Sequence, residues 1–259
     1  IDELTGGFKN CELYILAARP SMGKSALGLQ MAYHSTKQGK KPVFFSLEMT
    51  AESLMIRLIS SLTNIPHRSL TNGGEYDGAE VSRVISEIQN SGLNIIDKVD
   101  LDLLQIRAIL RQLKASGGVD IVFIDYLQLM DAGIKAQNRE REVAIISKTL
   151  KQIAKEMNIP VVAIAQLNRL VEMKADKRPM LADLRESGAI EQDADVVMLI
   201  YRPEYYGIKF YDKNQLLSTE GKADIIVAKN RNGATGETRL NFNREIVAFN
   251  NHYGNFDED

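Results

Sequence analysis

The sequence predicts an α/β fold with a mostly parallel central sheet that is flanked by helices and extended by a C-terminal antiparallel hairpin. Three observations support this prediction. Short apolar runs alternate with segments of helical periodicity, as in βαβ units. A sequence typical of phosphate binding follows the first apolar run. Near the C-terminus, two strand-like segments flank the turn-forming residues 232–236.

The strands are short, apolar and bounded by turn-forming residues. Gly39 breaks the pattern before the second strand, and the fourth strand ends at Asp125. Because the runs are apolar on both faces, we expect them to be buried in a parallel sheet. The six expected strands cover residues 13–17, 42–47, 93–96, 119–125, 161–166 and 196–200, and the hairpin covers 223–228 and 238–249.

Helical spacing defines the segments between the strands. In one of them Leu103, Ile106 and Leu110 recur at that spacing, and an Asp at 100 or 102 can cap the helix. The longest helix is stopped by Pro160 and the residues before it. The expected helices cover residues 25–38, 51–63, 79–91, 103–113 and 139–157.

Composition narrows the class of protein. The 259 residues are 44% hydrophobic and 25% charged, as in a globular protein with a sizeable core. No apolar run is long enough for a membrane span, and we expect neither a signal peptide nor a membrane partner. The single cysteine, Cys11, excludes an internal disulfide framework, so the cytoplasm is the expected compartment. We expect one domain over residues 1–254 and a mobile acidic tail at 255–259.

A candidate P-loop lies between the first strand and the first long helix. In a P-loop, backbone N–H groups and the helix N-terminus surround a phosphate, so ATP is the expected ligand. Lys24 is expected to reach the β- and γ-phosphates, and the Ser25 hydroxyl to bind Mg²⁺. The alternative is a Gly-Lys-Ser sequence that only caps a helix. The loop comprises Ala18, where the general pattern has glycine, and then Arg19, Pro20, Ser21, Met22, Gly23, Lys24 and Ser25.

Polar residues at three other strand ends can complete a hydrolytic site. Asp125 is the candidate second Mg²⁺ ligand, although a lone Asp at a strand end is also typical of a turn. Glu48 is the candidate general base, and its alternative role is to stabilise the N-terminus of the next helix. Gln166 is the candidate γ-phosphate sensor.

The chain resembles the motor domain of the hexameric bacterial replicative DNA helicases, the DnaB family, within the RecA-like P-loop NTPases. The resemblance covers almost the whole chain, and its most specific part is the stretch 183–195. The Ala at position 18 also fits the family, whereas Ser25 stands where Thr is common. The residues that carry the resemblance are 18–25, 46–49, 124–129, 166–169, 183–195 and 229–233.

The resemblance implies functional residues that their types alone do not reveal. Residues 183–188 match a loop that grips single-stranded DNA, in which Arg185 contacts phosphate and the peptide N–H groups of Glu186 and Gly188 donate to it. Lys229 and Arg231 match a pair that reaches the ATP of a neighbouring subunit, with Arg231 as an arginine finger in trans.

The family also implies partners and a context. We expect single-stranded DNA, a homo-hexamer, a primase and a helicase loader as partners, with translocation 5′ to 3′. Family members carry an N-terminal domain and a linker helix before this domain, and nothing in the sequence resembles them. We therefore expect the chain to be a fragment of a longer protein.

Two other function classes are compatible with the same fold. A RecA- or RadA-like recombinase would coat DNA as a filament, but the stretch 183–195 fits the helicases better. A KaiC-type nucleotide switch would bind ATP without translocating. Retention of a full set of hydrolytic residues argues against an inactive switch. The net charge of −2 gives no global sign of nucleic-acid binding, so a local basic surface such as residues 169–185 would be needed, although such a run is also typical of a solvated loop.

Overall fold

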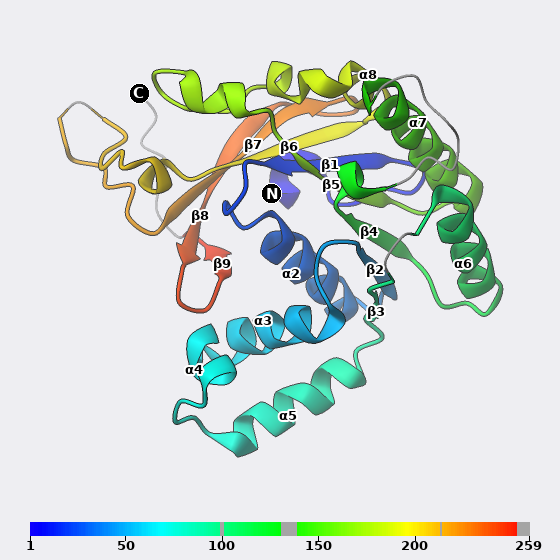
Figure 1. Cartoon of the computed structure of the whole chain (residues 1–259), viewed down its shortest axis with the longest axis horizontal. Coiled ribbons are helices and arrows are strands. Elements are labelled where there is room, and N and C mark those ends of the chain that lie inside the picture. The colour runs from blue at the N-terminus through cyan, green and yellow to red at the C-terminus, as the bar shows by residue number, and fades with distance from the viewer. Residues whose placement is uncertain (99–100, 131–138, 213, 253–259) are drawn as a thin grey trace.

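A nine-stranded sheet forms the centre of the molecule (Figure 1). The computed structural model describes residues 1–98, 101–130, 139–212 and 214–252, without the side chains of 185–187. The strand order is β3-β2-β4-β5-β1-β6-β7-β8-β9. Strands β1 to β6 are parallel, and β7, β8 and β9 are antiparallel additions at one edge. The strands are β1 Leu13–Ala18, β2 Pro42–Ser46, β3 Asn94–Ile96, β4 Ile121–Asp125, β5 Val161–Gln166, β6 Val196–Tyr201, β7 Lys222–Asn230, β8 Gly236–Asn243 and β9 Ala248–Asn251.

Helices cover both faces of the sheet. Helix α2 packs on one face with α3 and α5 beyond it, whereas α6, α7 and α8 cover the other face (Figure 1). The α-helices are α1 Asp2–Thr5, α2 Lys24–Lys37, α3 Ala51–Thr63, α4 His67–Asn72, α5 Gly78–Gln89, α6 Leu103–Ala115, α7 Arg139–Met157 and α8 Gly188–Asp193. The 3₁₀ helices are η1 Leu127–Leu129, η2 Arg169–Met173, η3 Leu181–Ser187 and η4 Pro203–Tyr206.

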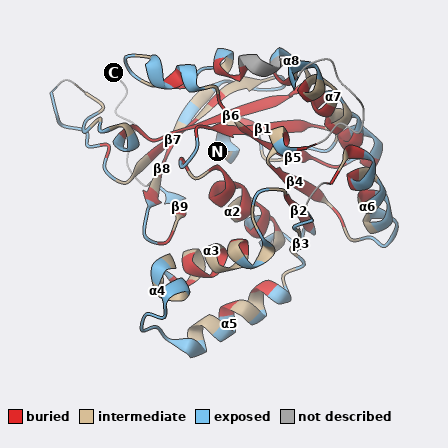
Figure 2. Ribbon diagram, viewed as in Figure 1, coloured by how far each residue is buried: buried red, intermediate tan, exposed pale blue. Residues whose placement is uncertain are grey.

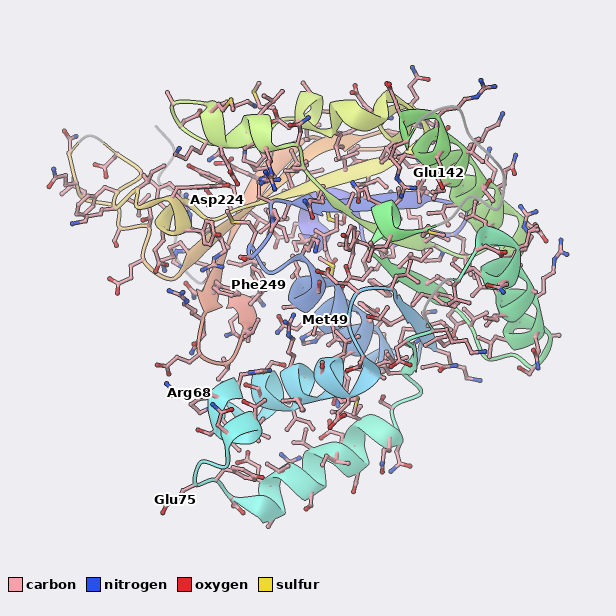
Figure 3. All side chains as sticks on the ribbon, viewed as in Figure 1. Met49, Arg68, Glu75, Glu142, Asp224 and Phe249 are labelled. Carbon is pink, nitrogen blue, oxygen red and sulfur yellow. The ribbon has the colours of Figure 1, made fainter. Side chains whose placement is uncertain are left out.

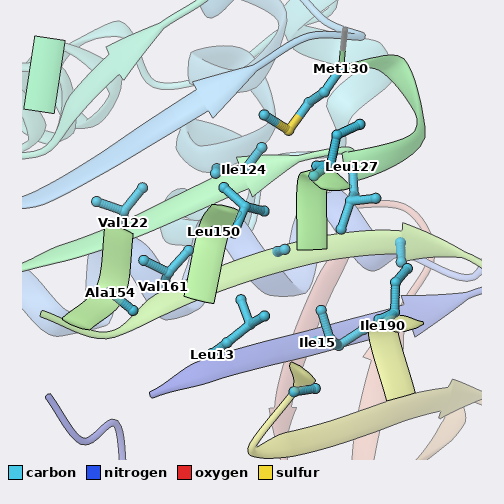
Figure 4. Packing of buried hydrophobic residues seen from close by; sticks show 14 of the residues in the cluster. Leu13, Ile15, Val122, Ile124, Leu127, Met130, Leu150, Ala154, Val161 and Ile190 are labelled. Atoms are coloured by element: carbon cyan, nitrogen blue, oxygen red, sulfur yellow. The ribbon is translucent and has the colours of Figure 1, made fainter. Parts of the chain in front are cut away.

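The sheet divides the core into two layers because successive side chains of a strand point to opposite faces. In β1, Leu13 and Ile15 pack against the α7 side, whereas Tyr14 and Leu16 pack against the α2 side. Every residue of β1, β2, β4 and β6 is buried, as expected for strands covered on both faces (Figure 2). Figure 4 shows the α7 layer, in which Leu150 and Ala154 lie over Val122 and Val161.

The structure confirms the α/β class, the mostly parallel sheet and the C-terminal antiparallel hairpin. Helix α3 begins where the sequence predicts because the Thr50 side chain accepts a hydrogen bond from the backbone N–H of Ser53 (3.2 Å). Asp102, rather than Asp100, caps α6, and Asp100 lies outside the described residues, as does the predicted tail at 255–259. No helix in the described ranges is long and apolar enough to cross a membrane.

Three features differ from the sequence prediction. The short helices α4 and α8 were not predicted, because six residues are too few for a clear helical period. The predicted last strand is divided into β8 and β9 by a turn that includes Val247, which has a positive φ of 52°. A β-branched residue gives no sequence indication of such a turn.

Candidate nucleotide-binding site

The loop between β1 and α2 has the backbone shape of a phosphate cradle. Ser21 and Gly23 have positive φ angles of 66° and 94°, so the chain curls tightly before α2 begins at Lys24. A Cβ atom on Gly23 would lie 2.8 Å from the Phe249 ring of β9, which is labelled in Figure 3. Both the backbone angle and the close ring therefore require glycine at this position.

Lys24 is held between two other elements at the same edge of the sheet. Its Nζ lies 3.4 Å from Oε2 of Glu48, which follows β2, and 4.7 Å from the centre of the Tyr126 ring, which follows β4. The Lys24 side chain is nearly buried, whereas that of Glu48 is about half exposed. The structure therefore brings together two of the residues that the sequence predicts, and it adds Tyr126.

Asp125 is the last residue of β4 and is fully buried. Among the described residues, no group makes a well-formed hydrogen bond to either carboxylate oxygen. Burial raises the pKa of Asp125, while the nearby Ser25 hydroxyl and the Lys24 ammonium act in the opposite direction. A buried carboxylate without a partner, next to a hydroxyl at the end of a phosphate loop, fits a Mg²⁺ ion, which is usually held by one or two protein oxygens plus phosphate and water.

Gln166 lies at the carboxyl end of β5, beside Ala18 of β1 in the sheet register. Its backbone is held by the side chain of Gln128 in η1. The Gln128 amide donates to the Gln166 carbonyl (2.9 Å), and its oxygen accepts from the Gln166 N–H (3.0 Å). Gln128 belongs to a motif that carries the family resemblance, but the sequence assigns it no role, because only the fold brings residues 38 positions apart into contact.

Two buried arginines support the loop. Arg19 donates from Nε to Glu172 (2.8 Å) and from a terminal nitrogen to the Leu167 carbonyl (2.8 Å). Its side chain is therefore bound by η2 and the end of β5. Arg202, which follows β6, donates to the Ser21 carbonyl (3.2 Å) and stacks on the Phe242 ring at 3.7 Å. No local pattern in the sequence distinguishes Arg202 from other arginines.

Lys229 and Arg231 lie at the opposite edge of the sheet. Asn230 at the end of β7 pairs with Val196, which pairs with Tyr14 near the start of β1. The P-loop follows the other end of β1, and a six-residue strand spans about 20 Å. Within one chain, these two cations therefore lie far from Lys24, and the structure does not bring them to the P-loop.

The segment predicted to grip DNA follows the candidate site along the chain. Its backbone forms η3 and then α8, so it is helical rather than an open loop. The side chains of Arg185 and Glu186 lie outside the described ones, whereas Gly188 is exposed. The buried Asp183 carboxylate accepts from the Met180 N–H and the Lys174 ammonium, each at 2.6 Å, and so points inward.

The basic run before this segment is largely neutralised. Besides the Lys174–Asp183 pair, Arg178 is paired with Asp224 at 3.4 Å and with Glu237. Asp224 is labelled in Figure 3. These cations therefore contribute less free positive charge than the sequence suggested for residues 169–185.

Cavity size does not identify the site. Cavities of 610 and 490 Å³ lie between the N-terminal segment and the second half of α2, and no predicted site residue lines them. A cavity of 170 Å³ is lined by Gln166, Gln128 and Asp183. The assignment of the site therefore depends on the chemistry at the strand ends.

The carboxyl ends of β2, β4, β5 and β1 are neighbours in the sheet and bring together Glu48, Asp125, Gln166 and the P-loop. In open parallel sheets, ligands bind outside these ends. The fold and this constellation define a RecA-like P-loop NTPase domain.

Comparison with known proteins narrows this class to one family. The family model "DnaB-like helicase C terminal domain" matches residues 1–251. The chain is 42% identical to the replicative DNA helicase DnaC of Bacillus subtilis over 262 residues, covering 100% of this chain and 56% of that protein. It is 42% identical to the replicative DNA helicase DnaB of Haemophilus influenzae over 257 residues, covering 97% of this chain and 53% of that protein.

Solved structures agree with these matches. One of them, an isolated ATPase domain, superposes with a TM-score of 0.90 at 36% identity, covering 97% of this chain and 88% of that one. A DnaB-like replicative helicase, described with its interactions with primase, gives a TM-score of 0.89 at 36% identity, covering 97% of this chain and 61% of that one. This chain belongs to the DnaB-like helicase C terminal domain family, and it spans about half the length of the curated relatives it matches.

Proposed function

We propose that this chain is the ATP-hydrolysing motor of a replicative DNA helicase. In this proposal six copies form a ring, move along single-stranded DNA 5′ to 3′ and separate the strands at the replication fork. The observation that carries the proposal is the location of the P-loop and of Lys229 and Arg231 at opposite edges of one sheet. Two such half-sites complete each other only between subunits in a head-to-tail arrangement, which closes into a ring when the rotation permits.

Each residue of the site has a separate task in ATP hydrolysis. Lys24 neutralises charge on the β- and γ-phosphates, and Glu48 accepts a proton from the attacking water. Gln166 contacts the γ-phosphate through a side chain whose backbone Gln128 fixes. Ser25 and Asp125 would hold Mg²⁺, which supplies Lewis-acid stabilisation of phosphate charge.

Arg231 acts in trans as an arginine finger, with Lys229 beside it. Such a finger contributes about 10³–10⁵ in rate in comparable phosphoryl-transfer enzymes. About half of the Arg231 side-chain surface is exposed, which supports its contact with a neighbouring subunit. The sheet register supports action in trans rather than in cis.

The DNA-gripping segment follows from the same assignment. Arg185 would bind backbone phosphate, and the N–H groups of Glu186 and Gly188 would donate to it. Contacts to phosphate carry no base information, so a motor that uses them can hold every sequence equally well. A ring concentrates one such segment from each subunit around a single channel.

A replicative helicase also needs partners. We include a primase and a helicase loader in the proposal and place the protein in the cytoplasm. The solved DnaB-like replicative helicase that interacts with primase supports the first of these partners. The family assignment supports the loader only by analogy.

The proposal is tested with the full-length protein that contains this chain. ATP turnover is measured with and without single-stranded DNA, and unwinding is measured on a forked duplex, with the Lys24→Ala protein as the inactive control. We expect DNA to stimulate turnover and the fork to be separated. Strand exchange without unwinding would instead indicate a recombinase, and DNA-independent turnover without unwinding would indicate a nucleotide switch.

A further inference from the structure

A buried carboxylate lies beside the two candidate trans-acting cations. Asp195 immediately precedes β6 and is 3% exposed. Its Oδ2 accepts from the Leu13 backbone N–H (2.8 Å) and from the Lys151 ammonium of α7. Its backbone N–H donates to the Leu13 carbonyl (2.9 Å). Asp195 is therefore fixed to both β1 and α7.

The same residue holds Arg231 at two points. The Asp195 carbonyl accepts from the Arg231 backbone N–H (2.8 Å), and Oδ1 lies 3.3 Å from a terminal nitrogen of the Arg231 guanidinium. The other terminal nitrogen donates to the Gln192 carbonyl in α8 (3.0 Å). The guanidinium is thus oriented on one side, while about half of the side chain stays exposed.

Lys229 is held by the same end of α8. Its ammonium donates to the carbonyls of Glu191 (2.5 Å) and Ala194 (2.7 Å). Carbonyl groups at a helix C-terminus lack intrahelical partners and attract cations. Burial lowers the pKa of Lys229, and the positive charge of Arg231 lowers it further.

Helix α8 connects this anchor to the DNA-gripping segment. It starts at Gly188, directly after η3, and ends at Asp193, two residues before Asp195. A six-residue helix has little room to bend, so a displacement at its N-terminus is passed on to the carbonyls at its C-terminus. The contacts of Lys229 and Arg231 therefore depend on where α8 lies.

We infer that Asp195, together with the C-terminal carbonyls of α8, positions Arg231 for the neighbouring ATP site and links that position to the DNA-gripping segment. This inference rests on the proposed function, in which Arg231 acts in trans. Asp195 touches neither ATP nor DNA in it and is a positioning residue. Lys151 balances its charge, so the carboxylate remains paired when Arg231 moves.

The test uses Asp195→Asn in the full-length protein. The amide is nearly isosteric and can still accept from the Leu13 N–H, but it removes the charge that orients the guanidinium. Because misplacing a catalytic group by about 1 Å can cost about 100-fold in rate, we expect kcat for ATP to fall between about 10- and 100-fold. ATP affinity and ring formation are unchanged. The matched control, Asp193→Asn, stays within about twofold of wild type.

Mixing experiments separate positioning from structural damage. Arg231→Ala and Asp195→Asn subunits each have an intact P-loop, so each regains turnover when mixed with Lys24→Ala subunits, which donate an intact finger. Mixed with each other they regain none. In the Arg231→Ala background, adding Asp195→Asn lowers kcat no further, because the finger is already lost. A structural defect would lower kcat in that background too and would prevent rescue.

The outcomes distinguish this inference from the proposed function. If Arg231→Ala keeps normal turnover, or is not rescued in demonstrably mixed rings, the trans assignment fails. If Arg231→Ala is inactive and rescued while Asp195→Asn has normal kcat, this inference alone fails. A rise in kcat for Asp195→Asn also overturns it, because the carboxylate would then restrain the finger. If Asp195→Asn does not fold, Asp195→Glu replaces it, and a normal kcat for that longer carboxylate has the same meaning.

Discussion

Lys24 and Glu48 form an ion pair across the carboxyl edge of the sheet, with 3.4 Å between Nζ and Oε2. The pair joins the P-loop to the end of β2 and brings the candidate phosphate-binding cation next to the candidate general base. Because Glu48 is about half exposed, water screens the pair and its contribution to stability is small. The contact is therefore weak enough for a phosphate group to replace the carboxylate at Lys24.

Lys24→Ala is expected to abolish ATP turnover and leave the fold intact, because it removes a charge at the β- and γ-phosphates without removing core volume. Turnover and thermal unfolding are measured on the full-length protein. Lys40→Ala, at an exposed position after α2, is the matched control and stays active. Normal turnover in a folded Lys24→Ala protein would contradict the P-loop assignment.

Glu48→Gln is expected to retain ATP binding and lose hydrolysis, because an amide cannot accept the proton of the attacking water. The loss of turnover should reach about 10²–10⁴-fold, the usual contribution of general-base catalysis. Glu52→Gln, an exposed position in the first turn of α3, is the control. A decrease smaller than about tenfold would place the base elsewhere.

Gln128→Ala tests the contact between η1 and β5. It removes both hydrogen bonds to the Gln166 backbone, so we expect about 1–3 kcal/mol lower stability. We also expect about tenfold slower turnover at unchanged ATP affinity, since the sensor side chain loses its fixed origin. Denaturant unfolding and single-turnover kinetics measure the two effects, with the exposed Gln112→Ala as control. Unchanged turnover would show that the orientation of Gln166 does not depend on Gln128.

Arg185→Ala is expected to weaken single-stranded DNA binding about equally for all sequences. Losing one phosphate contact should reduce the slope of log K against log salt by about 0.7. Binding of several oligonucleotides is measured over a range of salt. Arg68→Ala on α4, labelled in Figure 3 far from η3, is the control. Equal affinity and an unchanged slope would remove Arg185 from the DNA path.

Much of the fold follows from local patterns in the sequence. The bounds of α3 and α7 agree with prediction because a Thr50 cap starts the first and the Pro160 region ends the second. The turn-rich 232–236 segment correctly placed the connection between β7 and β8. Short helices and the turn at Val247 escaped prediction because neither has a local pattern that outweighs its neighbours.

The sequence by itself determined the P-loop, because its residues are contiguous and their spacing carries the chemistry. It also placed Glu48, Asp125 and Gln166 at strand ends, and parallel strands bring their carboxyl ends to one edge. Only the tertiary structure decided that Lys229 and Arg231 lie at the opposite edge, since this depends on the antiparallel register of β7 with β6. The contacts of Asp195 with Leu13, 182 residues away, and with Lys151 likewise arise only when the sheet and α7 pack together.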